Sequence, residues 1–316
     1  MVRAIITGIT GQDGSLLASK LLKKNYEVIG ITRQKTKKSL RNLKKLKIEK
    51  DIQLIEVDLL NRQYVKNTLD KFRKLDFIYN FAGQSSVSSS FHNPNETFIS
   101  NTRPVLNFLD IIAKHYPYIR FYNSSSGEVY GDTGGVLASE KTKFRPTSPY
   151  GIAKQAAYEI VANYRKSYNI FCVSGILFNH ESALRSSGFL IRKLIDGILE
   201  IKLGKTKTLE LGNLEILRDW GYAPEYVEAI DLITKNNFPE DFIVSTGKPH
   251  SLTELLEKTF SYHDLNWTDH VVSDNKYIRK QDPKFNAGDP SKIYKAFGWK
   301  AQVDLDEMIK RIFEVV

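Results

Sequence analysis

The stretch ITGITGQDGSLLASKLL (residues 6–22) is the most informative part of this 316-residue chain. Its three glycines lie between an apolar segment and a segment with helical spacing. The spacing is G-x-x-G-x-x-G rather than G-x-G-x-x-G, but both patterns allow a tight turn with free N–H groups at a helix start. We predict a phosphate-binding turn whose residues contact a dinucleotide: Gly8, Thr10, Gly11, Gln12, Asp13 and Gly14.

Apolar runs and helical patterns alternate along the chain. The runs predict strands at 4–7, 28–32, 52–57, 77–81, 119–122, 171–178 and 242–245. Helical spacing occurs at 15–24, 63–72, 104–116, 189–204, 224–235, 251–260 and 304–316. Near-continuous apolar strands that alternate with helices are typical of a parallel sheet covered on both faces.

The predicted fold class is therefore α/β. We expect a Rossmann-type doubly wound parallel sheet in residues 1–175 and a smaller mixed α/β substrate domain in residues 176–316. Some later elements are expected to return to the first domain, because the last predicted strand lies far along the chain.

The net charge of +10 raises the question of nucleic acid. Much of the excess lies in residues 33–50, where leucines and an isoleucine predict a short amphipathic helix with a solvated basic face. We therefore expect no nucleic-acid partner and, instead, an electrostatic preference for an anionic small substrate.

Cysteine content and hydropathy point to the compartment. Cys172 is the single cysteine, so no intrachain disulfide or cysteine-based metal cluster can form. The six histidines show no metal-ligand spacing, and we predict no metal. Without a long apolar run or a secretory leader, the chain is expected to be cytoplasmic and to have no membrane partner.

The end of the second predicted strand indicates the cofactor. An acidic residue there would bind the ribose hydroxyls of NAD, but the chain has Arg33, and a guanidinium suits a 2′-phosphate. We predict NADP over NAD. Asp58 and Leu59 follow the third strand and are expected at the adenine, while Ala82 and Gln84 line the cofactor's path.

Two further motifs indicate chemistry. In SPYGIAK, Tyr150 and Lys154 share one helix face, and a nearby ammonium favours a phenolate that serves as base in alcohol oxidation by a nicotinamide. In NSSSGEVYG (residues 123–131), Glu128 alone would be read as a surface or ion-paired carboxylate. Its position after a strand that ends at the cofactor site predicts proton transfer instead.

With these motifs in place, the chain resembles the extended short-chain dehydrogenase/reductase superfamily and, within it, the GDP-mannose 4,6-dehydratases. The resemblance lies in ITGITGQDGS, FYNSSSGEVYG, SPYGIAK, GILFNHES, GNLEILRDWGYAPEYVEA and EDFIVSTGKPHS. It implies bound NADP and a three-step reaction on a GDP-hexose: oxidation at C4, elimination of water across C5 and C6, and hydride return to C6. The product would be a GDP-4-keto-6-deoxy sugar.

The resemblance also implies roles. Ser126 takes the active-site hydroxyl position, Glu128 that of the elimination base and Tyr150 that of the oxidation base, while Lys154 lowers the Tyr150 pKa and holds the nicotinamide ribose. One departure is Gly127, where the dehydratase pattern has a hydroxyl residue. Either Glu128 serves as both base and acid, or water donates the proton, or elimination is impaired.

Substrate contacts follow from the same likeness. Asn179 and Ser85 are expected at the substrate, and His180 and Arg185 beside the nicotinamide and the cofactor phosphates. Basic residues expected around the diphosphate and nucleoside are Lys193, Arg218 and Arg279. The segment RKQD (residues 279–282) replaces an RP-x-E pattern. The likeness further implies a homodimer or homotetramer.

An alternative function is a GDP-sugar oxidoreductase or epimerase that uses Tyr150 and Lys154 without elimination. Glu128 favours the dehydratase, whereas Gly127 leaves the alternative open. The identity of the sugar, a hexose or a manno-configured heptose, stays open as well.

Overall fold

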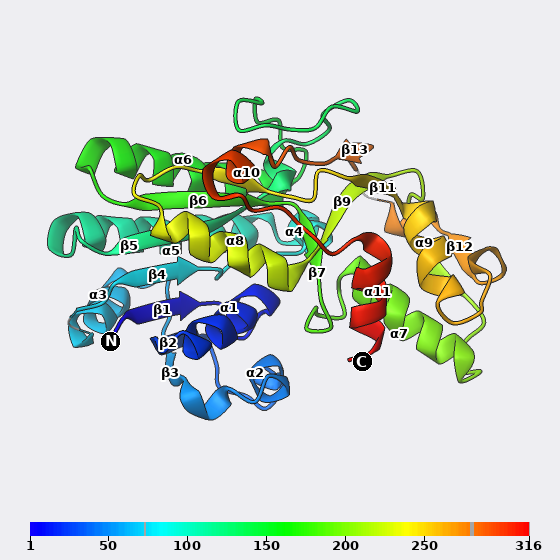
Figure 1. Ribbon diagram of the computed structural model, residues 1–316, viewed down its shortest axis with the longest axis horizontal. Helices are drawn as coiled ribbons and strands as arrows, with labels where there is room; N and C mark the ends of the chain where they lie inside the picture. The colour runs from blue at the N-terminus through cyan, green and yellow to red at the C-terminus, as the bar shows by residue number, and fades with distance from the viewer. Residues whose placement is uncertain (73, 279–280, 316) are drawn as a thin grey trace.

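A parallel sheet forms the centre of the molecule (Figure 1). The computed structural model describes residues 1–72, 74–278 and 281–315. In these residues the sheet has seven strands in the order β10-β6-β5-β4-β1-β2-β3, and every neighbouring pair is parallel. The strands are β1 (Arg3–Thr7), β2 (Glu27–Thr32), β3 (Gln53–Glu56), β4 (Phe77–Asn80), β5 (Arg120–Ser126), β6 (Cys172–Leu177) and β10 (Phe242–Val244). The predicted Rossmann-type sheet is confirmed.

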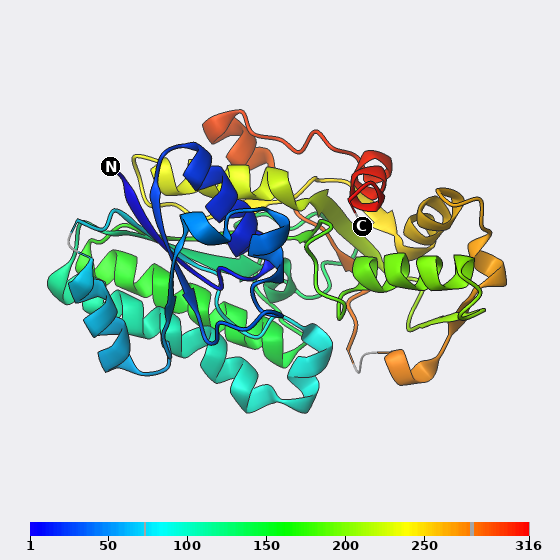
Figure 2. The ribbon, with the colours of Figure 1, turned by 90° about the horizontal axis from the view of Figure 1, so that it is seen from below.

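Helices cover both faces of this sheet, as its apolar strands require. One face packs against α1 (Gln12–Lys23), α2 (Arg41–Lys45), α8 (Ala223–Lys235) and α10 (Ser291–Phe297). The other face packs against α3 (Arg62–Lys71), α5 (Pro94–His115) and α6 (Pro149–Tyr168). Figure 2 shows α1 and α8 on one side of the strands and α5 and α6 on the other.

Two predicted boundaries are wrong in an informative way. Strand β5 does not end at Tyr122 but continues to Ser126, because residues 123–126 pair with β6 and the first three of them are buried. Helix α5 begins ten residues before the predicted start at Pro104, which lies inside the helix. The serine cluster is thus part of the sheet rather than a loop.

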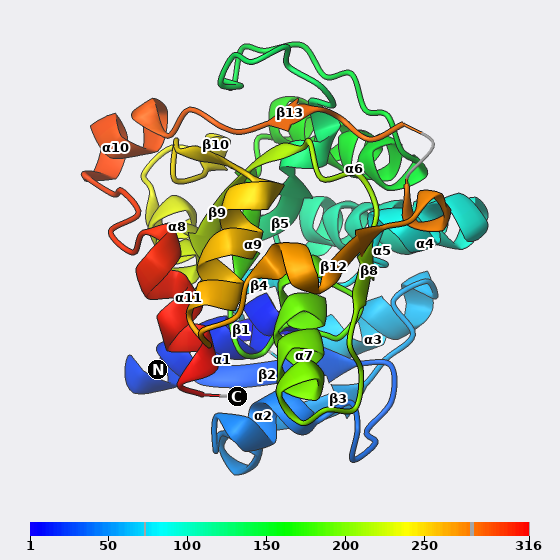
Figure 3. The same cartoon turned by 90° about the vertical axis from the view of Figure 1, so that its right-hand side faces the viewer.

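A second group of elements follows β6. Strand β9 (Leu217–Tyr222) pairs with β7 (Asn179–Glu181), β11 (Pro249–Ser251) and β13 (Phe285–Asn286), while β8 (Leu209–Leu211) pairs with β12 (Val271–Ser273). Helices α7 (Leu190–Lys202), α9 (Leu252–Ser261) and α11 (Leu305–Phe313) share a separate apolar cluster around these strands (Figure 3). In contrast, α8, β10 and α10 return to the large sheet.

The remaining elements are short. They are α4 (Val87–His92) and the single turns η1 (Glu49–Asp51), η2 (Gly127–Val129), η3 (Trp267–Asp269) and η4 (Asn275–Tyr277). No helix in the described part of the chain combines the length and the apolar composition that a membrane crossing needs.

Candidate active site

Two adjoining cavities lie where the central strands end. The outer cavity has a volume of about 840 Å³ and extends from the glycine turn to Arg33 and Asp58. The inner cavity has a volume of about 260 Å³ and contains the serine cluster. Gly8, Gly11, Phe81 and Ser85 line both cavities, which therefore adjoin at the glycine turn and the loop after β4.

The glycine turn between β1 and α1 has no room for side chains. Gly8 adopts a positive φ of 64°, and a Cβ at Gly14 would lie 2.4 Å from the Gly8 carbonyl oxygen. The N-cap residue Gly11 supplies no side-chain cap, so the first N–H groups of α1 stay available to a ligand. This geometry fits a pyrophosphate at a helix N-terminus.

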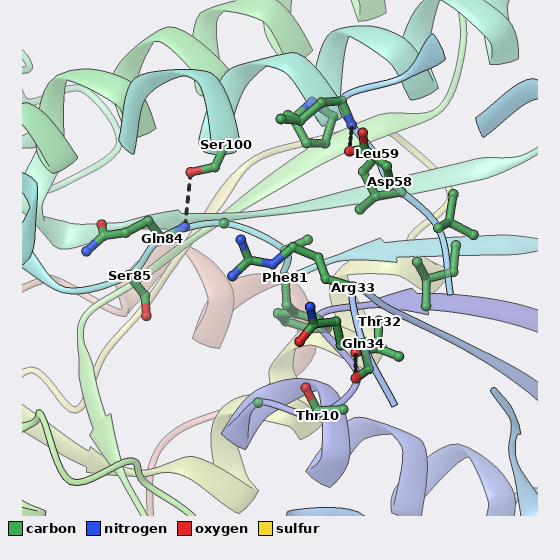
Figure 4. A pocket seen from close by; sticks show the side chains of 18 of the residues that line it. Thr10, Thr32, Arg33, Gln34, Asp58, Leu59, Phe81, Gln84, Ser85 and Ser100 are labelled. Carbon is green, nitrogen blue, oxygen red and sulfur yellow. Dashed lines mark hydrogen bonds between the residues drawn. The ribbon is translucent and has the colours of Figure 1, made fainter. Parts of the chain in front are cut away.

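The predicted cofactor residues line the outer cavity: Thr10, Arg33, Asp58, Leu59, Ala82 and Gln84. Figure 4 shows the Arg33 side chain extending into this cavity. The loop after β4 is held from two sides, because Ala82 N donates to Thr7 Oγ1 (3.1 Å) and Asn101 Nδ2 donates to the Gln84 carbonyl (2.9 Å). Asn101 is a residue that the sequence analysis did not identify.

The four predicted catalytic residues meet in the inner cavity. Ser126 ends β5, and Glu128 lies on the η2 turn, where its backbone N–H donates to Ser126 Oγ (3.2 Å). Tyr150 and Lys154 lie on the first turns of α6, which starts with a Ser148 cap and Pro149, a favourable helix start. Residues from three elements, β5, η2 and α6, thus converge on one small space.

Burial controls the ionisation of the Tyr–Lys pair. Burial raises the pKa of Tyr150 to about 12, and Glu128 adds to the increase while Ser126 opposes it through a hydrogen bond. Burial also lowers the pKa of Lys154 to about 8, and its Nζ donates to the Ser124 carbonyl (2.8 Å). In this structure the pKa of Tyr150 therefore stands above its usual value rather than below it, because burial outweighs the polar contacts.

The predicted substrate residues are only partly brought together. Asn179, Ser85 and Arg218 line the inner cavity, and so do His180 and Arg185, which are predicted cofactor contacts. Arg218 is almost fully buried, and its Nη2 donates to Asp282 Oδ1 (2.8 Å).

The other two predicted basic residues are not placed at the inner cavity. Lys193 does not line it: its Nζ donates to the Glu210 carbonyl (2.5 Å) and lies 4.0 Å from the centre of the Tyr277 ring. Arg279 lies outside the described residues.

Comparison with known proteins assigns the family. The family model described as GDP-mannose 4,6 dehydratase matches residues 5–312. The chain is 38% identical to GDP-mannose 4,6 dehydratase of Cricetulus griseus over 98% of this chain and 90% of the relative. It is 34% identical to the GDP-mannose 4,6-dehydratase of Vibrio cholerae, with 97% and 91% covered. The chain belongs to the GDP-mannose 4,6-dehydratase family.

Solved structures agree on the fold. A dTDP-glucose 4,6-dehydratase of Bacillus anthracis matches with a TM-score of 0.87 at 21% identity and covers 100% of this chain and 96% of its own. A UDP-glucuronic acid 4-epimerase of Bacillus cereus matches with a TM-score of 0.88 at 21% identity, with 99% and 98% covered. Because a dehydratase and an epimerase match equally well, the fold does not separate the two activities. The sequence relatives do, and they confirm the predicted nucleotide-sugar 4,6-dehydratase over the epimerase.

The structure gives a physical context to the departure of this family member at Gly127. A Cβ at this position would lie 2.7 Å from Phe178 Cδ1 and 3.1 Å from Asn286 Oδ1. Asn286 Nδ2 in turn donates to the carbonyls of Gly127 (3.0 Å) and Gly131 (2.9 Å). Phe178 and Asn286 therefore occupy the space into which a side chain at Gly127 would project. The sequence marks Asn286 only as a polar residue between the apolar Phe285 and Ala287.

We expect Gly127→Ser, which restores the hydroxyl of the family pattern, to destabilise the protein. The new Cβ would displace the Phe178 ring, and overpacking of this kind costs about 1–3 kcal/mol. Urea unfolding measures the change in free energy. Gly188→Ser is the matched control, because nothing lies within 4 Å of a Cβ there. Equal stability of the two variants would contradict the prediction.

Proposed function

We propose that this enzyme converts GDP-mannose, or a manno-configured relative, into the GDP-4-keto-6-deoxy sugar. The observation that carries the proposal is that Glu128 shares one small cavity with Ser126, Tyr150 and Lys154. Oxidation alone needs the last three residues, whereas elimination of water needs an additional carboxyl group. The relatives of Cricetulus griseus and Vibrio cholerae carry the name of this reaction.

In the proposed reaction the phenolate form of Tyr150, which the positive charge of Lys154 favours, removes the proton of the C4 hydroxyl, and Ser126 orients that hydroxyl. The glycine turn and Arg33 would hold NADP, which would supply the hydride acceptor for C4 and the hydride donor for C6. The C4 ketone acidifies the C5 proton, which Glu128 removes. Gly127 carries no side chain, so we propose that Glu128 also delivers this proton to the departing C6 hydroxyl, which leaves as water. When hydride returns to C6, the proton held by Tyr150 passes to C5, so both residues return to their starting states.

The chain's other polar groups hold the substrate and cofactor. Lys154 is proposed to bind the nicotinamide ribose, and His180 and Arg185 are proposed to lie beside the cofactor, because both line the inner cavity. Asn179, Ser85 and Arg218 are proposed to contact the sugar and diphosphate, because all three line the inner cavity. Lys193 and Arg279 are kept as proposed contacts to the outer part of the nucleotide.

The test is a panel of GDP-, UDP- and dTDP-sugars incubated with the purified enzyme and NADP+, with each product weighed by mass spectrometry. A GDP-linked manno sugar is expected to lose one water without net consumption of cofactor. If NADPH is consumed while no GDP-sugar loses water, the proposed function is wrong. Comparison of GDP-mannose with a GDP-linked manno-heptose identifies the preferred sugar.

We also propose NADP as the cofactor, on the basis of Arg33 at the outer cavity. Charge-assisted hydrogen bonds to a 2′-phosphate contribute about 1.5–3 kcal/mol, so Arg33→Ala should weaken NADP+ affinity by about tenfold or more. The affinity for NAD+, which has no 2′-phosphate, should change little. Calorimetric titration of both cofactors measures this, with the exposed Lys37→Ala as control. A variant that loses affinity for both cofactors equally would contradict the prediction.

The assembly and domain roles are further parts of the proposal. We propose a homodimer or homotetramer, because apolar side chains are exposed on the neighbouring helices α5 (Phe98, Leu106) and α6 (Ile152). Light scattering at micromolar concentration tests this.

Residues 1–175 are proposed to bind the cofactor and residues 176–316 the nucleotide sugar, apart from the elements that return to the large sheet. The lone, buried Cys172 supports a reducing cytoplasm.

A further inference from the structure

An ion pair joins the phosphate-binding turn to the strand that carries Asn179. Asp13 lies in the first turn of α1, and His180 follows Asn179 in β7. His180 Nε2 lies 3.0 Å from Asp13 Oδ1, and its Nδ1 lies 2.6 Å from the Phe178 carbonyl oxygen. Both side chains line the inner cavity, and neither is explained by the three reaction steps.

The two partners of the imidazole fix its charge. A carbonyl oxygen only accepts hydrogen bonds, so Nδ1 must carry a proton; a carboxylate also only accepts, so Nε2 must carry one too. Both ring nitrogens thus face acceptors, a geometry that favours the protonated imidazolium; the ring is buried and stacks on the Tyr226 ring with centroids 4.7 Å apart. Burial alone would lower the pKa of His180, but the neighbouring Asp13 carboxylate outweighs burial, and the pKa of His180 is raised. Burial alone would raise the pKa of Asp13, but His180 and Arg185 outweigh it and lower the pKa of Asp13 to about 2.

Further hydrogen bonds reinforce the same junction. Gln12 Nε2 donates to the His180 carbonyl (3.0 Å), and Ser182 Oγ donates to Gln12 Oε1 (2.8 Å). Strand β7 in turn pairs with β9, with His180 opposite Gly221, three residues after Arg218. Side-chain hydrogen bonds and strand pairing thus connect the glycine turn, through β7, to the strand β9 that carries Arg218.

We propose that Asp13 and His180 are positioning residues. Their ion pair fixes the phosphate-binding turn against β7, so that the cofactor site and the sugar site keep a fixed position relative to each other. The inference rests on the proposed function. The pair has a second effect, because the imidazolium neutralises a carboxylate that would otherwise face the cofactor's diphosphate from the start of α1. A lone buried charge is far more costly than a paired one.

The charge state is tested in the wild-type protein without any reaction. Protein labelled with ¹⁵N-histidine is studied by NMR at pH 8, with His180 assigned from the spectrum of His180→Gln. We expect one imidazolium signal that persists at this pH. A neutral His180 at pH 8 would overturn the proposal. Other ionisable groups around the pair are Glu181 of β7, Arg185 after that strand, Lys154 and Tyr150 of α6, Tyr122 of β5 and Tyr226 of α8.

Variants test the positioning role. His180→Gln leaves Asp13 as an unpaired carboxylate, and we expect NADP+ affinity to fall at least tenfold and the KM for GDP-mannose to rise, with a smaller change in kcat. Asp13→Asn combined with His180→Gln removes both charges, and the double variant should recover part of the cofactor affinity. The matched control is His250→Gln, since His250 Nδ1 contacts Glu254 Oε1 at the same 3.0 Å outside both cavities.

The outcomes are distinct from those of the function test, because cofactor affinity is measured by calorimetry without substrate. If His180→Gln binds NADP+ as tightly as wild type, or if the double variant recovers no affinity relative to His180→Gln, the ion pair does not position the turn. If the NADP+ results are as expected and no GDP-sugar is dehydrated, the proposed function fails while the positioning role stands.

Discussion

Glu128→Gln stops the loss of water from the GDP-sugar, with the expected rate falling by about 10²–10⁴-fold. The amide has the size of the carboxylate but cannot take the C5 proton or return it to the leaving hydroxyl. Because Glu128 is held on its turn through its backbone N–H to Ser126 Oγ, the exchange should leave the η2 turn in place. The loss is therefore chemical rather than structural.

The measurement follows both halves of the reaction. Tyr150 and Lys154 remain, so oxidation at C4 should still occur, seen as near-ultraviolet absorbance of reduced nicotinamide, while mass spectrometry detects no loss of water. Glu215→Gln, an exposed glutamate next to the cavity residue Ile216, is the control and should react as wild type. Elimination at full rate by the Glu128 variant would remove that carboxylate from the mechanism.

Tyr150→Phe is expected to abolish both half-reactions, with turnover reduced by about 10³-fold or more. The ring can still fill its buried place, but no oxygen remains to receive the C4 proton. This variant should form neither reduced nicotinamide nor the dehydrated product, whereas the Glu128 variant forms the first without the second. The contrast separates the oxidation base from the elimination base.

Tyr168→Phe is the control for Tyr150, because it ends the same helix α6 with an exposed side chain. Single-turnover absorbance with enzyme in excess over GDP-mannose gives the oxidation rate directly. Reduced nicotinamide formed by Tyr150→Phe at the wild-type rate would show that another group accepts the proton.

Much of the architecture could be predicted from local patterns. The glycine turn, the seven strands and the α1, α3 and α8 helices follow from hydrophobic period and turn residues, which act over a few positions along the chain. The errors occurred where tertiary burial overrides polarity. Residues 123–126 are polar, yet they extend β5 because β6 pairs with them. Pro104, the predicted start of a helix, is buried within α5.

The candidate site was predicted in part. Motif spacing and the resemblance to the family predicted many of the residues that line the two cavities, among them Thr10 and Arg218. Lys193 lies elsewhere, because the Glu210 carbonyl and the Tyr277 ring bind its ammonium group. Asn101 and Asn286 were missed, since each acts by holding a loop distant in sequence and belongs to no recognisable motif.

The sequence by itself therefore determined the α/β class, the phosphate-binding turn and the Tyr–Lys helix face, because each depends on backbone preferences over a few residues. Only the tertiary structure decided that Phe178 and Asn286 occupy the space beside Gly127, and that Asp13 meets His180. These contacts join residues 51 to 167 positions apart. These contacts depend on the order of strands in the sheet and on the packing of β7 against the start of α1. No pattern within a few residues of the sequence encodes either arrangement.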